Sequence, residues 1–119
     1  MTTIKQALEN IMTLDGILCA AIVDSSSGMV LGSLGSGIDL EIAAAGNTEL
    51  VRTKLKTMKA LGTKDHIEDI LITLGKQYHI ICPLKQSVGI FIYTVVEVSK
   101  GNLALARRKI HDTEADLVI

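Results

Sequence analysis

The segment between residues 67 and 96 contains three short runs of β-forming residues, and their apolar side chains fall on both faces of each predicted strand. In the first run Ile70 and Ile72 point one way, while Ile67 and Leu71 point the other. A sheet with one wet face alternates apolar and polar residues instead. Both faces of this sheet therefore need a cover. A short chain has few elements to supply one, so we expect part of the cover to come from a second copy.

The composition is that of one small domain spanning residues 1–119, with 48% hydrophobic but only 3% aromatic residues. Its core must therefore consist mainly of Ile, Leu, Val and Ala. The formal net charge of −1 provides no broad field for nucleic acid or an anionic membrane, so we expect no nucleic-acid partner. No apolar run approaches the ~20 residues of a transmembrane helix.

The cysteines and the N-terminal segment predict a cytoplasmic protein. Cys19 and Cys82 lie far apart inside apolar runs, so we expect buried, reduced thiols rather than a disulfide. Lys5 and Glu9 interrupt the N-terminal segment in an amphipathic pattern, which is unlike the continuous apolar stretch of a signal peptide.

The hydrophobic periodicity predicts the element order α-β-β-α-β-β-β-α, in a five-stranded, mainly antiparallel α+β sheet. The expected ranges are helix 4–11, strands 17–23 and 29–34, helix 40–61, strands 67–74, 78–84 and 88–96, and a final helix containing residues 103–117. The expected helix caps are Thr2 or Thr3, Ser36 or Asp39, and Ser99. The apolar stripe of the second helix comprises Leu40, Ala43, Ala44, Asn47, Leu50, Val51, Leu55 and Met58. A turn at residues 24–28 joins the first two strands, and the glycines at 32, 35 and 37 relax the joint between strand and helix.

The search for catalytic motifs is negative. Gly75-Lys76 is followed by Gln77, so the phosphate-loop pattern lacks its hydroxyl residue. His79 and Cys82 are three apart on a predicted strand, so they point to opposite faces and cannot share a metal ion. No nucleophile elbow surrounds the serines at 25–27. We therefore predict no catalytic residue, no cofactor and no metal, and we interpret Glu68-Asp69 as a solvated strand end or as charge that limits improper pairing at the sheet edge.

Two features of the second helix suggest contacts with other chains. Its outer face carries Arg52, Lys56 and Lys59, which could meet an acidic partner or could simply be a solvated face near the helix C-terminus. Asn47 lies among glycine and alanine, where it could pair with its own counterpart across a two-fold axis. Burial of Asn47 under its own sheet is an equal alternative.

Three segments, in this order and spacing, resemble the roadblock family of dynein light-chain-like proteins, and specifically its prokaryotic branch. They are the hairpin at 16–33, the strand pair at 72–84 and the helix start at 102–107. The resemblance covers nearly the whole chain. The chain departs from the family pattern at Cys82, where a basic residue is common, and near Val96-Glu97.

The resemblance implies a roadblock (profilin-like) fold and a homodimer in which strands pair across the two-fold axis into one continuous sheet. The second helices then pack on one face and the terminal helices lie on the other. It also implies a non-enzymatic scaffold or regulator that binds a Ras-like small GTPase. The alternative is a small-molecule sensor of PAS-like or profilin-like type, which a co-purifying ligand would favour.

The strand at 67–74 is the natural edge to pair with its copy, and an interface of ~1,600 Å² or more is expected. The predicted dimer interface comprises Ile67, Ile70, Leu71, Ile72, Leu74, Asn47 and Leu50. The predicted partner-binding residues are Arg52, Lys56 and Lys59.

Overall fold

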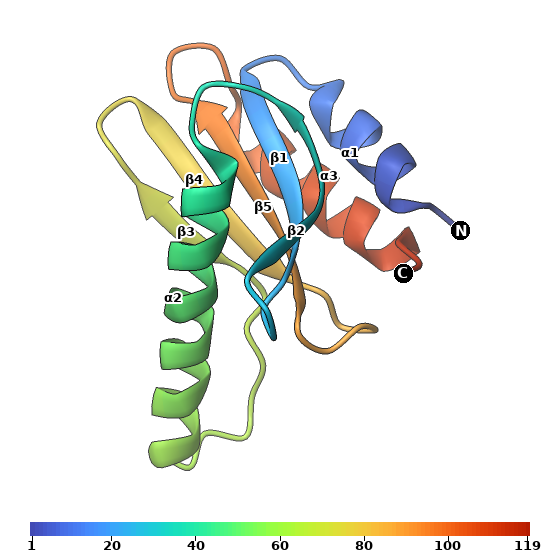
Figure 1. Ribbon diagram of the computed structural model, residues 1–119. Helices are drawn as coiled ribbons and strands as arrows, with labels where there is room; N and C mark the ends of the chain where they lie inside the picture. The colour runs from blue at the N-terminus through green and yellow to red at the C-terminus, as the bar shows by residue number, and fades with distance from the viewer.

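Three helices and five strands follow one another in the predicted order in the computed structural model, which describes residues 1–119. They are α1 (Ile4–Met12), β1 (Ile17–Asp24), β2 (Met29–Gly35), α2 (Leu40–Ala60), β3 (Ile70–Thr73), β4 (Gln77–Pro83), β5 (Ile90–Glu97) and α3 (Leu103–Asp116). The strands form one sheet in the order β2-β1-β5-β4-β3, with every neighbouring pair antiparallel (Figure 1). The predicted α+β architecture is confirmed, and β2 and β3 are the two edge strands.

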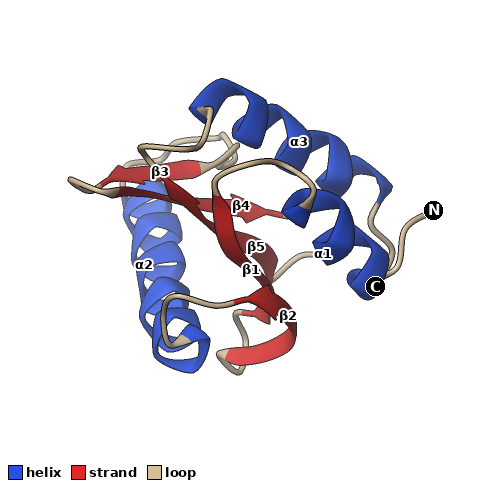
Figure 2. Cartoon of the chain, turned by 90° about the horizontal axis from the view of Figure 1, so that it is seen from above, coloured by secondary structure: helices blue, strands red, loops and turns tan.

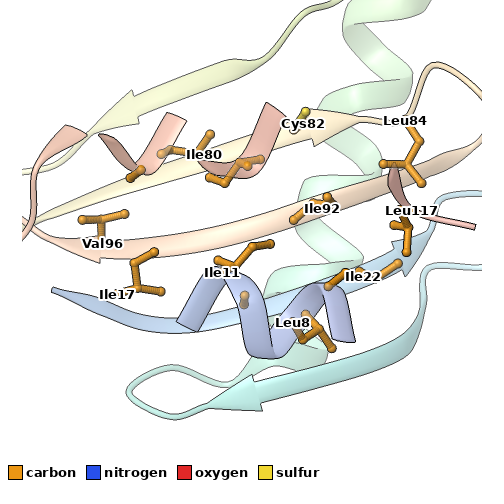
Figure 3. Packing of buried hydrophobic residues seen from close by; sticks show 14 residues of the cluster. Leu8, Ile11, Ile17, Ile22, Ile80, Cys82, Leu84, Ile92, Val96 and Leu117 are labelled. Atoms are coloured by element: carbon orange, nitrogen blue, oxygen red, sulfur yellow. The ribbon is translucent and has the colours of Figure 1, made fainter. Parts of the chain in front are cut away.

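Helices cover both faces of the sheet, with α2 on one side and α1 and α3 on the other (Figure 2). On the α1/α3 side, Ile11, Ile80 and Ile92 are completely buried in one apolar cluster (Figure 3). On the α2 side, a second cluster buries Phe91 and Tyr93. The central strands are therefore apolar on both faces because the chain's own helices cover both. Only the outer sides of the edge strands β2 and β3 lack a neighbouring strand.

Side chains at the helix starts satisfy free backbone N–H groups. Thr3 and Gln6 form a reciprocal capping box at α1, and Asp39 accepts from two backbone N–H groups at α2, as predicted. The prediction that Ser99 caps the last helix is wrong. Asn102 caps α3 instead, since its side chain accepts from Leu105 N at 3.0 Å.

The helix α2 is amphipathic over its whole length but buried only in its first half. Ala44, Thr48 and Val51 are buried, whereas Leu55 is 49% exposed. The C-terminal part of the helix projects past the end of the sheet (Figure 1). None of the three helices combines the length and the apolar character that crossing a bilayer requires.

The starts of β3 and β5 show the largest differences from the predicted strand boundaries, and one glycine has another role than predicted. β3 begins at Ile70, so Ile67 lies in the linker that follows α2, and Val88 lies in the loop before β5. Gly32 lies within β2 rather than at the strand-to-helix joint. A Cβ there would meet Ile4 Cγ2 at 2.7 Å, so this glycine allows α1 to pack closely on the sheet.

The turn between β1 and β2 forms as predicted. The Asp24 carboxylate accepts from the backbone and hydroxyl of Ser26, and these hydrogen bonds hold the pKa of Asp24 below its usual value. Gly28 has φ of 75°, a conformation that glycine adopts without strain.

Candidate protein-interaction surface

The edge strand β3 presents apolar side chains on both of its faces. Ile70 packs against the α2-side cluster, and by alternation Ile72 lies on the same face, while Leu71 packs against the α1/α3-side cluster. The three isoleucine and leucine side chains are half-buried, and Leu74 just beyond the strand is exposed. No other strand of the chain pairs with the outer side of β3.

The two predicted interface residues of α2, Asn47 and Leu50, lie on a side of the helix that the sheet covers only partly, which we call the open side of α2. Asn47 is half-buried and Leu50 is 37% exposed. α2 packs mainly on β1 and β2, which leaves β3 and the start of β4 less covered on this face. Asn47 borders a hollow of about 340 Å³ that His79 and Tyr93 also line. The structure thus brings β3 and the open side of α2 to one face, but Ile67 lies apart from them in the linker.

A chain of hydrogen bonds crosses this face from β5 to the start of β4. Tyr93 Oη lies 2.9 Å from His79 Nδ1, and His79 Nε2 lies 2.9 Å from Gln77 Oε1. Because the amide oxygen accepts, Nε2 carries the ring proton and Nδ1 accepts from the tyrosine hydroxyl. Burial lowers the pKa of His79 and raises the pKa of Tyr93 to about 12, and the nearby Asn47 amide opposes the rise at Tyr93.

A second polar cluster joins the linker before β3 to α3. Asp69 is only 4% exposed and accepts two hydrogen bonds from Arg107, at 2.9 and 3.1 Å, and one from His111 at 2.7 Å. The interpretation of Asp69 as part of a solvated strand end is therefore wrong. Its partners lie 38 and 42 residues away, and no local pattern in the sequence indicates them. These hydrogen bonds from two partly exposed side chains to a buried carboxylate tie the end of the linker, just before β3, to α3.

Neither this cluster nor any other group of side chains offers evident metal or thiol chemistry. Cys82 Sγ lies 3.8 Å from His111 Nδ1, but burial and nearby carboxylates raise the pKa of Cys82 to about 12. The thiol is therefore protonated and a poor nucleophile at neutral pH. Both cysteines are free and buried, and no three ligating side chains lie close enough to hold a metal ion.

The three basic residues predicted to bind a partner lie on one face of α2, at i, i+4 and i+7. Arg52 donates to Ser26 O at 3.0 Å and lies 3.6 Å from Glu49, so it is tied to the chain's own turn. Lys56 and Lys59 are exposed and have no carboxylate within 4.0 Å.

Comparison with known proteins supports the fold. No family model matches the sequence, and no curated protein matches it. The structure is similar to the roadblock/LC7 domain from Streptomyces avermitilis, with a TM-score of 0.78 and 11% identity over 92% of this chain and 89% of that one. It is also similar to Myxococcus xanthus MglB, with a TM-score of 0.74 and 14% identity over 92% and 83%. An MglB in a tetrameric arrangement gives 0.71 and 13% identity over 94% and 88%. The predicted roadblock fold is confirmed.

Proposed function

We propose that the chain is a cytoplasmic, non-enzymatic regulator that forms a homodimer and binds a Ras-like small GTPase. The observation that carries the proposal is the edge strand β3, whose half-exposed apolar side chains lie beside the open side of α2 in a chain with the roadblock fold. The resemblance in sequence implies the GTPase, since roadblock domains serve as platforms for such proteins. The tetrameric MglB supports assembly of similar chains with one another.

The unpaired edge strand β3 is the basis for the proposed dimer. An unpaired strand with apolar side chains is a site for addition of another strand, and a two-fold axis beside β3 would pair it with its own copy. The same axis would bring the open sides of two α2 helices together above β3. The core of the proposed interface consists of Ile70 and Ile72 from β3, Leu74 just beyond it, and Asn47 and Leu50 from α2. Leu71 contributes through its backbone, because its side chain points to the opposite face of the sheet, towards the α1/α3-side cluster.

Light scattering tests the dimer. The wild-type chain should have twice the mass of one copy, and Ile72→Lys or Ile70→Lys should yield monomer, because a cation in the seam has no partner there. Leu31→Lys is the matched control, since Leu31 is an exposed residue of the opposite edge strand β2. A stable wild-type monomer, or equal effects of Ile72→Lys and Leu31→Lys, would overturn the proposed seam.

The GTPase contact is proposed to include the basic face of α2. Each Ras-like GTPase of the same genome, loaded with GDP or with a non-hydrolysable GTP analogue, can be titrated into the dimer by calorimetry. Lys56→Glu combined with Lys59→Glu should weaken the complex and leave the dimer mass unchanged, because both residues are exposed and unpaired. Lys5→Glu on α1 is the control. The absence of binding by every such GTPase would reject the partner class.

The same preparations test the sensor alternative. A small molecule released by denaturation and detected by mass spectrometry would favour a ligand-binding domain. The proposal expects none, and it expects any change in GTP hydrolysis to come from the GTPase's own residues. Arg107 is engaged with Asp69, which argues against its acting as an arginine supplied to the nucleotide.

A further inference from the structure

A groove of about 470 Å³ lies between the projecting half of α2 and the loop that joins β4 to β5. Its apolar lining comes from α2, the linker after it and the β4–β5 connection: Leu55, Ile67, Pro83, Leu84 and Val88. Leu84 is buried and Ile67 and Pro83 are half-buried, so they form the base, while Leu55 and Val88 are exposed at the two sides. The groove thus has an apolar base, one helical wall and one loop wall, and the polar side chains of Asp65, His66 and Lys85 also line it.

Hydrogen bonds hold the loop wall in place, although the apolar side chain that this loop presents is exposed to solvent. Val88 is 97% exposed. The next residue is anchored, because Gly89 O accepts from the Ser25 backbone at 2.7 Å and from its hydroxyl at 2.6 Å. Leu84 N donates to Ile90 O at 2.8 Å and closes the base of the loop. An exposed β-branched side chain on an anchored loop is positioned to contact another molecule with little loss of chain entropy.

The helical wall is cationic. Residues 52–64 contain five basic residues and no acidic one, in a chain whose formal net charge is −1. Arg52 and Lys59 flank Leu55 on the same helical face, at i−3 and i+4. Of the five, only Arg52 has a carboxylate within 4.0 Å. Two acidic residues lie at the groove, and both are near a cationic or imidazole side chain: Glu68 binds Lys85 at 3.1 Å and His66 at 2.8 Å, and Asp65, which lines the groove, lies 3.6 Å from His66.

We propose that this groove binds an amphipathic segment of a partner protein in which carboxylates stand beside apolar side chains. Apolar side chains would pack against Leu55 and Val88, and the carboxylates would face the free lysines. The inference rests on the proposed function only in making this segment part of the small GTPase. A concave channel with two walls favours a peptide over an anionic membrane, which would need the apolar and basic residues on one plane.

A peptide titration tests the groove without any GTPase. The probe is a fluorescein-labelled helical peptide of glutamate and leucine, followed by fluorescence anisotropy. Two further peptides carry lysine in place of glutamate, or serine in place of leucine. The glutamate–leucine peptide should bind and the other two should not. Equal binding of the lysine peptide, or of the serine peptide, would overturn the proposal.

Exposed substitutions locate the binding. Val88→Ser and Leu55→Ser should each weaken peptide binding, with a combined loss of roughly tenfold or more, and Lys59→Glu should weaken it further. Leu105→Ser on α3 and Lys5→Glu on α1 are the matched controls, since both residues are exposed and lie on helices of the opposite face. Circular dichroism checks that each variant is folded. Unchanged binding by Val88→Ser with Leu55→Ser would overturn the site.

The same variants show whether the groove binds a membrane or a second copy of the chain instead of a peptide. Binding to vesicles of anionic phospholipid that is lost in Val88→Ser, without peptide binding, would replace the partner with a membrane. A change of mass in light scattering for Val88→Ser would make the groove a contact between copies. Peptide binding by a chain that binds no GTPase would reject the proposed function and keep the groove. If the chain binds a GTPase and Val88→Ser and Leu55→Ser leave that binding unchanged, the proposed function would stand and the groove would be rejected as its binding site.

Discussion

Glu68 and Asp69 are adjacent carboxylates, each in an ion pair, but their surroundings are opposite. The Asp69 side chain is 4% exposed, whereas those of Glu68 and its partner Lys85 are more than half exposed. A buried carboxylate that loses its charge leaves donors unmatched, while an exposed pair is replaced by water. Burial therefore decides which of the two stabilises the fold.

Asp69→Asn should lower the free energy of unfolding by about 2–3 kcal/mol, since Arg107 and His111 lose an ionic acceptor. This is at the low end for a broken buried pair because Arg107 and His111 remain partly exposed and can be hydrated. Glu68→Gln, the neighbouring control, should have a much smaller effect. Urea unfolding at a fixed chain concentration measures both. Equal losses for the two variants would contradict this account.

His79 makes stability depend on pH. Burial lowers its pKa below the ordinary value of 6.5, so the unfolded ring takes up a proton at a higher pH than the folded ring. As pH falls below about 6.5, the unfolded state gains a proton that the native state lacks, and the free energy of unfolding decreases. The contribution is complete above the unfolded pKa and is lost as pH falls through the folded pKa.

His79→Gln should therefore flatten the decline in the free energy of unfolding between roughly pH 7 and pH 5. Tyr93→Phe is the informative control. It removes the hydroxyl that donates to His79 Nδ1 but keeps the burial that shifts the histidine, so most of the pH dependence should remain. Denaturant unfolding across this range measures both slopes. If His79→Gln kept the wild-type slope, other titratable groups would be responsible for the pH dependence of the free energy of unfolding.

At the level of elements, local chemistry indicated the caps of the first two helices, where a named candidate serves, but it chose the wrong polar residue for the last helix. Ser99 and Asn102 both precede the last helix within a few residues, and both can cap. Between them the chain forms a turn, in which Lys100 N and Gly101 N both donate to Glu97 O, and the helix begins only after it, with Asn102 as its cap. Ser99 instead donates to Glu97 at 3.3 Å.

Asn102→Ala should cost about 1 kcal/mol of unfolding free energy, because Leu105 N loses its acceptor. Ser99→Ala should change stability by less than ~0.5 kcal/mol, since its only side-chain bond is exposed. Thermal unfolding monitored by circular dichroism at one chain concentration compares the two. A larger loss for Ser99→Ala would place the cap where the sequence first suggested it.

The order and type of the elements were predictable because the spacing at which apolar residues recur distinguishes strands from helices over the whole chain. The boundaries were not, because distant residues set them: β3 starts after Asp69, which is fixed by Arg107 and His111 of α3. Periodicity likewise placed Leu55 on an apolar stripe of α2, but it could not show that the helix extends beyond the end of the sheet. The groove beside Leu55 therefore had no local signal, whereas the exposed edge of β3 did.

At the scale of the whole molecule, the proposed dimer cannot rely on backbone pairing alone. β3 has four residues, so its ladder with a second copy would contain few hydrogen bonds. A stable interface buries ~1,600 Å², and most of that area must come from side chains of β3 and the open side of α2. In the proposed dimer the short ladder would set the register, and the apolar contacts would supply most of the affinity.

Backbone exchange can detect that ladder directly. Leu74 N donates to Gln77 O at 2.8 Å, and Thr73 opposes Tyr78. Because inward and outward pairs alternate in an antiparallel ladder, the N–H groups of Leu71 and Thr73 point to the free edge. In a monomer they are exposed to water and exchange fast. In the proposed dimer they are bonded to the partner copy and exchange slowly.

Hydrogen–deuterium exchange followed by NMR should therefore find Leu71 and Thr73 protected in the wild-type chain and unprotected in Ile72→Lys. The outward N–H groups of β2 form the internal control, since the proposed axis leaves that edge in water and both proteins should exchange there alike. Protection should also fall as the wild-type chain is diluted, because dissociation frees the edge. Fast exchange at Leu71 and Thr73 in a sample whose mass is that of a dimer would place the contact elsewhere, and the open side of α2 would then be the first surface to examine.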